Sequence, residues 1–281
     1  MENIPNKRKF YTFVKDIKTI KIQGARNIAK AALRAYLLIP TKKSKKILID
    51  SRPTEPMMRK VLDLAEAGAS PQKILKHFNE AQMSINKLVL KVIKNGDRIF
   101  THCHSTNVVN ALIYAKKQKK SFEVYVTETR PLFQGRKTAK ELINAGIKTT
   151  LFIDSTFAFV IGKESKKDKI YSTKIFLGAD ALLKNGIINK VGSRAISEIA
   201  YINKVPVYVI ADSWKFTKEK VPIEQRDLNE IWDKAPKKIK MKNPAFEFVP
   251  KKYIHRIITE LGAMEYSNFT NLLSEKSHKP L

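Results

Sequence analysis

Residues 97–110 read DRIFTHCHSTNVVN. The turn signal Asn95-Gly96 comes directly before this stretch, and the short apolar run at 98–101 is suited to a β-strand. From Ser105 onward the pattern predicts a helix. The only cysteine of the chain, Cys103, is therefore expected at the point where a strand ends and a helix begins.

A junction of this kind gathers hydrogen-bond donors. Backbone N–H groups and the positive end of the helix dipole converge there, and the side chains of Ser105, Thr106 and Asn107 add further donors. Such a turn can bind a phosphate, and it can also lower the pKa of a thiol. The alternative for Cys103 is a purely structural role, because free cysteine is among the most buried residue types.

The composition is that of a globular protein without membrane segments. Its 281 residues allow one large domain or two smaller ones, and 43% of them are apolar. No apolar run approaches the roughly 20 residues that span a bilayer, and the polar N-terminus lacks the apolar segment of a signal peptide. A single cysteine can form neither an intramolecular disulfide nor a cysteine-based metal cluster. We expect a cytoplasmic protein.

The net charge of +28, from 54 basic and 26 acidic residues, favours contact with polyanions or phosphorylated substrates. The lysines are nevertheless spread along the chain, in runs such as 42–46 and 163–169. No basic motif alternates with aromatic residues as in an RNA-binding sheet. We interpret the charge as a solvated, lysine-rich surface, and we expect any binding of nucleic acid to lack sequence specificity.

An N-terminal helical domain is predicted over residues 1–95, because apolar side chains recur there at helical spacing. Residues 40–44 are predicted to form a loop, and residues 51–54 are expected to lead into a third helix. Ser70-Pro71 then starts a long helix by the usual arrangement of a capping residue followed by proline.

The pattern changes after Gly96, where short apolar runs alternate with helical segments. The predicted strands are 122–127, 149–154, 174–178 and 205–211, and the predicted helices are 108–117, 135–144 and 194–203. This alternation predicts a Rossmann-like, doubly wound α/β domain over residues 96–281, with a parallel sheet covered by helices on both faces.

Ligands of such sheets bind beyond the C-terminal ends of the strands. This rule selects the residues that directly follow predicted strands: Cys103, 128–130, 154–156, Asp180 and 212–213. Two of them have structural alternatives, since Asp154 is expected to cap the turn that follows it and Asp180 has the alternative of capping the next helix. No glycine-rich dinucleotide or phosphate-loop motif is present, so the sequence does not support a nucleotide cofactor.

Four motifs occur in a fixed order along the chain. They are THCHS at 101–105, TETRPLFQG at 127–135, GADALLKNGIINKVGS at 178–193 and NPAFE at 243–247. Together they resemble the family that contains the alpha, beta and delta subunits of eukaryotic initiation factor 2B, methylthioribose-1-phosphate isomerase and archaeal ribose-1,5-bisphosphate isomerase. The resemblance extends from Gln23 to a predicted helix at 250–262.

Cys103 and Asp180 match the catalytic cysteine and aspartate of the isomerases in this family, and their surroundings are most similar to the archaeal ribose-1,5-bisphosphate isomerase branch. The resemblance implies an aldose–ketose isomerase acting on ribose 1,5-bisphosphate in nucleoside monophosphate salvage, without a metal or cofactor. It also implies a homo-oligomer, either a dimer or a hexamer. The substrate would contact Gln23, Gly24, Ala25, Arg26, Arg52, Ser105, Thr106, Asn107, Asn189, Lys190 and Lys215.

These residue types suit the chemistry. A sugar phosphorylated at its anomeric carbon cannot open its ring simply by losing a proton, so the isomerisation needs an acid as well as a base at C2. A thiolate at a helix N-terminus is a suitable base, and a carboxyl kept protonated in a dry site is a suitable acid. Asp180 follows the apolar run 175–177, which predicts a raised pKa. Two phosphates call for basic side chains and amide donors.

Two other functions stay open, because fold alone does not determine function. One is a non-catalytic, translation-initiation-factor-like regulatory subunit, and the other is a methylthioribose-1-phosphate isomerase. Single residues also have structural alternatives: Asn189-Lys190 as an ordinary turn and Arg52 as an ordinary surface arginine. His102 and His104 flank the cysteine, but strand alternation points them away from it, so neither is the expected base.

Overall fold

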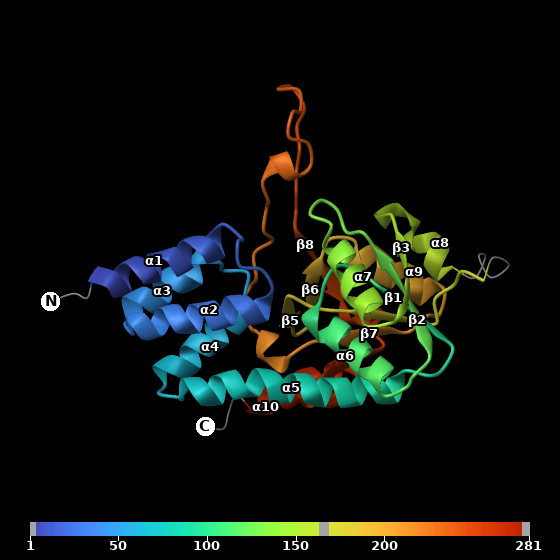
Figure 1. Ribbon diagram of the computed structural model, residues 1–281, viewed down its shortest axis with the longest axis horizontal. Helices are drawn as coiled ribbons and strands as arrows, with labels where there is room; N and C mark the ends of the chain where they lie inside the picture. The colour runs from blue at the N-terminus through green and yellow to red at the C-terminus, as the bar shows by residue number, and fades with distance from the viewer. Residues whose placement is uncertain (1–3, 163–168, 277–281) are drawn as a thin grey trace.

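The computed structural model describes residues 4–162 and 169–276 (Figure 1). Most of the lysine run at 163–169 lies outside the described residues. The chain begins with helices only, as predicted: α1 (Ile4–Lys18), α2 (Ala25–Leu38), α3 (Lys42–Ser51), α4 (Pro56–Glu66) and α5 (Pro71–Val92). The predicted division of the chain at residue 95 falls in the turn between α5 and the first strand, and it stays a prediction.

Capping explains where two of these helices begin. Ser70 caps α5 through a 3.2 Å bond from the Lys73 N–H to its hydroxyl, as predicted. The predicted loop at 40–44 is wrong, because α3 already begins at Lys42. There Thr41 and Ser44 cap the helix reciprocally, since each hydroxyl accepts a hydrogen bond from the other residue's backbone N–H. Serine is a less familiar partner in such a pair than glutamate, so the signal is easily overlooked.

A seven-stranded sheet follows, in the order β10-β9-β7-β4-β1-β2-β3. All neighbours run parallel except β9 and β10. The strands are β1 (Asp97–Thr101), β2 (Phe122–Thr127), β3 (Lys148–Phe152), β4 (Lys174–Leu177), β7 (Val207–Ile210), β9 (Arg256–Thr259) and β10 (Gly262–Met264). The predicted doubly wound α/β fold is confirmed.

Helices cover both faces of this sheet. Side chains alternate along β1, so that Ile99 packs with α5 and α6 while Phe100 packs with α8 and α9 on the other face. A strand buried on both faces reads as a continuous apolar run, which is why these strands were recognisable from the sequence. The remaining helices are α6 (Thr106–Lys117), α7 (Gln134–Asn144), α8 (Phe157–Ile161), α9 (Ser193–Ile202) and α10 (Tyr266–Lys276).

A second, antiparallel sheet lies beside those strands of the main sheet that come from the C-terminal half of the chain. It contains β5 (Ala181–Leu183), β6 (Gly186–Lys190) and β8 (Phe246–Pro250), in the order β5-β6-β8. Residues 217–245, which connect the end of the η3 turn (Ser213–Lys215) to β8, form an arm that projects from the body of the molecule (Figure 1).

The predicted helix at 250–262 is wrong. This segment contains the end of β8, a short 3-10 turn and strand β9. Ile257 and Ile258 are fully buried on opposite faces of the main sheet, in two different clusters of the core. A short apolar run of this kind has no periodicity that separates a doubly buried strand from a helix.

Helix α5 belongs to two hydrophobic cores. Its first half packs Ile74 and Phe78 against α2 and α4, while Ile85 and Val89 of its second half pack against α6 and the main sheet. In Figure 1 it runs along the bottom of the molecule, beneath both the helical region and the sheet. Among residues 4–162 and 169–276, none of the helices combines the length and apolar character that a bilayer span requires.

A buried ion pair joins the two central strands at the start of β1. The Lys174 ammonium lies 2.6 and 2.7 Å from the two carboxylate oxygens of Asp97, and both side chains are buried. Asp97 also accepts hydrogen bonds from the Lys94 N–H and the Thr173 hydroxyl. This carboxylate therefore fixes the turn before β1 to the start of β4.

Replacing Asp97 by Ala should lower the free energy of unfolding by about 3–5 kcal/mol, because it leaves Lys174 as a buried charge without a partner. Urea denaturation followed by circular dichroism measures the change. The control is Glu198→Ala, which breaks the exposed pair with Arg194 and should leave the urea midpoint almost unchanged. Equal midpoints for the two variants would contradict this role of Asp97.

Candidate active site

The direction in which the chain crosses the sheet reverses between β1 and β4. From β1 the chain adds β2 and β3 on one side, and it then returns to add β4, β7 and β9 on the other side. Doubly wound sheets bind ligands at such a switch point, beyond the C-terminal ends of the strands. Cys103 follows β1 and Asp180 follows β4, and these two strands are hydrogen-bonded neighbours.

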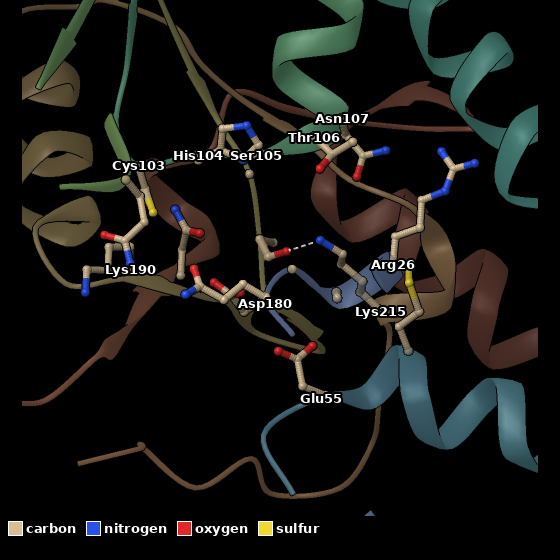
Figure 2. Close-up of a pocket in the computed structure, with 18 of the residues that line it drawn as sticks. Arg26, Glu55, Cys103, His104, Ser105, Thr106, Asn107, Asp180, Lys190 and Lys215 are labelled. Carbon is tan, nitrogen blue, oxygen red and sulfur yellow. Dashed lines mark hydrogen bonds between the residues drawn. The ribbon is translucent and has the colours of Figure 1, made fainter. Parts of the chain in front are cut away.

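The structure brings all of the residues predicted for the site to one pocket at this switch point. They are Gln23, Gly24, Ala25, Arg26, Arg52, Cys103, Ser105, Thr106, Asn107, Asp180, Asn189, Lys190 and Lys215. Figure 2 shows Cys103 and Lys190 on one side of Asp180, and Lys215 and Arg26 on the other. The roles of the individual side chains stay predictions.

The backbone of Cys103 is held in an unusual conformation. Its φ angle is 68°, in the left-handed region that residues other than glycine rarely adopt. Its N–H donates to the Thr129 hydroxyl at 2.9 Å, and its carbonyl accepts from the Thr138 hydroxyl at 2.9 Å. Neighbouring segments thus hold the Cys103 backbone from both sides, as the surrounding structure must do for a residue in a strained conformation.

Thr129, which binds the Cys103 N–H, is itself held by a residue that follows the next strand of the sheet. Thr129 also has a positive φ, of 63°. The Asp154 carboxylate, which follows β3, accepts hydrogen bonds from the Thr129 and Arg130 N–H groups at 2.7 and 2.6 Å. Asp154 was expected to cap the turn after it, but its side chain makes no such cap and instead holds the loop after the neighbouring strand.

The two histidines beside the cysteine have structural partners. One ring nitrogen of His102 lies 2.5 Å from the Thr127 hydroxyl and the other lies 2.9 Å from the Val191 carbonyl, so both are occupied. Burial lowers the pKa of His102, which keeps the ring neutral. His104 lies 3.2 Å from the Glu141 carboxylate on α7, and burial lowers its pKa as well.

Asp180 reaches the pocket because the segment after β4 passes very close to the segment after β1. A side-chain carbon on Gly178 would lie 2.6 Å from the Ser105 side chain, so only glycine allows this approach. The Asp180 N–H then donates to the Ile188 carbonyl of β6 at 2.8 Å. Asp180 precedes a strand, so the alternative that it caps a helix is wrong.

The small sheet adds two of the predicted residues. Asn189 and Lys190 lie in strand β6 and are buried, so they do not form an ordinary turn. The Asn189 amide donates to the Ser193 hydroxyl at 2.8 Å, which joins the strand to the start of α9. Lys190 lies beside Cys103 and Asp180, and burial lowers its pKa.

The opposite wall of the pocket comes from the helical region and from the turn after β7. Arg52, the C-cap of α3, is 7% exposed, so it is not an ordinary surface arginine. One of its N–H groups donates to the Glu224 carboxylate at 3.1 Å. Lys215 is buried and donates to the Ala179 carbonyl at 2.6 Å, the bond drawn in Figure 2. Buried cations next to Asp180 suit an anionic ligand.

The expectation of a low-pKa thiol is corrected by the structure. Helix α6 begins at Thr106, three residues after Cys103. Burial raises the pKa of the Cys103 thiol to about 12, and the negative charge of Asp180 adds to the effect, while Lys190 opposes it. In the ligand-free pocket the thiol is therefore protonated at neutral pH.

The expectation for Asp180 agrees with the structure. Burial raises the pKa of its carboxyl, although Lys215, Arg52 and Lys190 favour the charged form. Both Cys103 and Asp180 face the cavity, so a ligand can reach them even though protein surrounds them. A thiol and a carboxyl that both resist ionisation form a site in which protons are held rather than released to water.

The pocket also contains polar residues that were not predicted from the sequence, among them Glu55, Gln134 and Arg226. Gln134 lies within one of the four motifs, so that motif was a signal for it. Arg226 lies at the base of the arm, and Glu55 lies between Thr54 and the proline that begins α4. No local pattern distinguishes Glu55 and Arg226 from surface residues.

A possible metal-binding group lies next to the pocket. Within the part of the chain that the structure describes, ligand atoms of His77, Asp212 and Glu260 all lie within 4.8 Å of one another. They already bond to protein groups, since His77 lies 3.1 Å from Asp212 and Glu260 accepts from both the N–H and the hydroxyl of Ser213. This group therefore serves as a hydrogen-bond network that holds the η3 turn with Lys215.

The fold and the pocket together define a doubly wound α/β protein with a thiol, carboxyls and clustered cations around one pocket. Residues 64–266 match the Initiation factor 2 subunit family, and the chain belongs to this family.

Named relatives span nearly the whole chain. Ribose 1,5-bisphosphate isomerase of Methanocaldococcus jannaschii is 34% identical to this chain, and the match covers 88% of each protein. The solved translation initiation factor eIF-2B of Pyrococcus horikoshii OT3 matches with a TM-score of 0.78 and 24% identity, over 91% of this chain and 96% of that one. The 5-methylthioribose 1-phosphate isomerase of the same organism matches with a TM-score of 0.76 and 23% identity, over 95% and 88%. The two structures show the fold alone.

The raised pKa of Cys103 predicts slow alkylation. At pH 7.5 the folded protein should react with iodoacetamide more than about tenfold slower than the urea-unfolded protein, in which the thiol has an ordinary pKa. Its rate should also keep rising at pH values where the unfolded protein has reached its plateau. Cys103 is the only cysteine, so the label reports on this site alone.

Asp180→Asn should increase the alkylation rate of the folded protein at pH 8, because it removes the negative charge that opposes the thiolate. Equal rates for the folded and unfolded wild-type protein, with the same pH dependence, would contradict this account of the thiol.

Proposed function

We propose that the protein is an aldose–ketose isomerase that converts ribose 1,5-bisphosphate to ribulose 1,5-bisphosphate, as part of nucleoside monophosphate salvage. The observation that carries the proposal is that Cys103 and Asp180 line one pocket together with several buried cationic side chains. The name of the Methanocaldococcus jannaschii relative, at 34% identity over most of both chains, supports the same activity.

The reaction moves protons without any net gain or loss. In the first half, the bond from C1 to the ring oxygen breaks while that oxygen takes a proton, and C2 loses its proton while the C1=C2 double bond forms. In the second half, O2 loses its proton as C2=O forms, and C1 takes a proton. One base that carries hydrogen from C2 to C1, and one acid that serves the oxygens, are sufficient.

We assign the base to Cys103 and the acid to Asp180. A proton on Asp180 equips this residue to act as the acid, and it also removes the negative charge that adds to the effect of burial in raising the pKa of Cys103. The ammonium of Lys190 then favours the thiolate. The reactive form in this proposal is therefore a thiolate beside a neutral carboxyl, even though the isolated thiol has a high pKa.

The cations serve the two phosphates. The cations lie on two sides of Asp180: Arg26 and Lys215, from the start of α2 and the turn after β7, are on one side, and Lys190 is on the other (Figure 2). Amide donors of residues 105–107 lie at the N-terminus of α6, where an anion is stabilised by the helix dipole. A ligand with a phosphate at each end uses both groups of donors, which favours the bisphosphate over a monophosphate.

We further propose that the protein works as a homo-oligomer, a dimer or a hexamer, in the cytoplasm. The support in this chain is the arm at 217–245, on which Leu228, Trp232 and Ile239 expose large apolar side chains. Packing of the arm against a second subunit would remove these apolar side chains from water, which favours association.

Incubation of the purified protein with ribose 1,5-bisphosphate should produce ribulose 1,5-bisphosphate, measured by NMR of the sugar carbons. Cys103→Ser should reduce turnover by roughly 10²–10⁴-fold, because a hydroxyl is a far weaker base than a thiolate. Faster turnover of 5-methylthioribose 1-phosphate would favour the related isomerase activity. No turnover of either sugar, together with tight binding to an initiation factor, would favour a regulatory subunit.

Lys215→Ala should raise the KM for the bisphosphate by about ten- to a hundredfold, since a hydrogen bond to a charged group contributes about 1.5–3 kcal/mol. The matched control is Lys220→Ala, because Lys220 is exposed on the arm. The control should keep the wild-type KM, and circular dichroism checks that both variants fold. A similar KM for both variants would remove Lys215 from the proposed phosphate contacts.

A further inference from the structure

Two neighbouring side chains in the pocket wall have buried polar atoms without a partner. Among the described residues, no hydrogen-bond partner reaches Arg52 Nε, Arg52 Nη1 or Glu55 Oε2. The side chains are 8% and 3% exposed, and both residues line the pocket. A buried polar group without a hydrogen bond is unfavourable, so three such atoms at one place point to a ligand that satisfies them.

Glu55 does not serve its own helix. It occupies the N-cap position of α4, where a carboxylate commonly binds the first N–H groups, but its side chain makes no capping hydrogen bond. Figure 2 shows its carboxyl directed toward Asp180 and away from the start of α4. Its other oxygen lies 3.7 Å from Arg52 Nε, which is too far for a hydrogen bond.

Four charged groups face Glu55 from four different segments. Asp180 and Glu224 raise the pKa of its carboxyl, while Arg52 and Lys215 lower it. Burial is the largest influence, and together these effects raise the pKa of Glu55 to about 8. At neutral pH the residue therefore carries a proton that it can donate.

We propose that Glu55 is a substrate-binding residue: its protonated carboxyl and the two free N–H groups of Arg52 form one subsite for a phosphate group. All three groups donate hydrogen bonds, so the matching ligand group offers acceptor oxygens only, as a phosphate does. The inference rests on the proposed function for the identity of the ligand, and it adds a pH limit to binding. When Glu55 loses its proton, the subsite loses a donor and gains a negative charge that repels the phosphate.

The test measures the dissociation constant of ribose 1,5-bisphosphate by calorimetry at pH 7 and pH 9, for the wild-type protein and for Glu55→Gln. Glutamine keeps the shape and an N–H donor but cannot ionise. Wild-type affinity should fall by up to about tenfold between the two pH values, the limit for one titrating group with a pKa near 8. Glu55→Gln should bind like the wild type at pH 7 and should lose much less affinity at pH 9.

Two controls separate this effect from others. Glu219→Gln changes an exposed glutamate and should reproduce the wild-type pH dependence. Glu55→Ala lacks the donor and should bind more weakly than Glu55→Gln at both pH values. Lysines that titrate near pH 9 affect all variants alike, so the difference between the wild type and Glu55→Gln belongs to Glu55.

The outcomes distinguish the two proposals. If the wild type does not bind the bisphosphate at pH 7, the proposed function fails. If it binds, but Glu55→Gln shows the same pH dependence, the role of Glu55 fails while the proposed function stands. If the wild type binds more tightly at pH 9, Glu55 acts as a carboxylate that accepts from a sugar hydroxyl, and the phosphate subsite is wrong.

Discussion

The site depends on the packing of α5 into two hydrophobic cores at once. Phe78 in its first half fixes α2 and α4, and Val89 in its second half fixes α6 and the sheet. Gln82, between them, exchanges hydrogen bonds with Asn107 at the start of α6. Because one rigid helix connects both cores, the loop before α2 and the end of α3 are held over the C-terminal edge of the sheet. The pocket is the space between these two parts.

Within this pocket, burial and charge work against each other. Burial disfavours every ionised group, so it raises the pKa of Cys103, Glu55 and Asp180 and lowers that of Lys190. The cations and acids partly compensate one another, but unpartnered atoms of Arg52 and Glu55 are left over. In the proposed function an anionic ligand pairs with these cations and favours protonated carboxyls. The same dry surroundings suit a reaction that transfers protons without releasing them to water.

The sequence predicted the fold wherever one segment carried a complete local signal. Ser70-Pro71 marked the start of α5, and the apolar runs of β1, β2 and β4 marked strands buried on both faces. Prediction failed where the signal was incomplete. The segment 250–262 has apolar residues without a clear period, and Asp154 has a carboxylate whose partners, two N–H groups of another loop, are distant in the sequence.

The sequence by itself determined the alternation of strands and helices from β1 to β7 of the main sheet, and hence which residues follow those strands. That alternation placed Cys103 and Asp180 among the candidate positions, because the C-terminal ends of parallel strands share one edge, and the resemblance to the isomerases then singled them out. Only the tertiary structure decided the protonation of these groups and the presence of Glu55 beside them. A pKa depends on burial and on charges contributed by segments far apart in the chain, and the neighbours of Glu55, such as Asp180 and Lys215, approach it only when the helical region packs against the sheet.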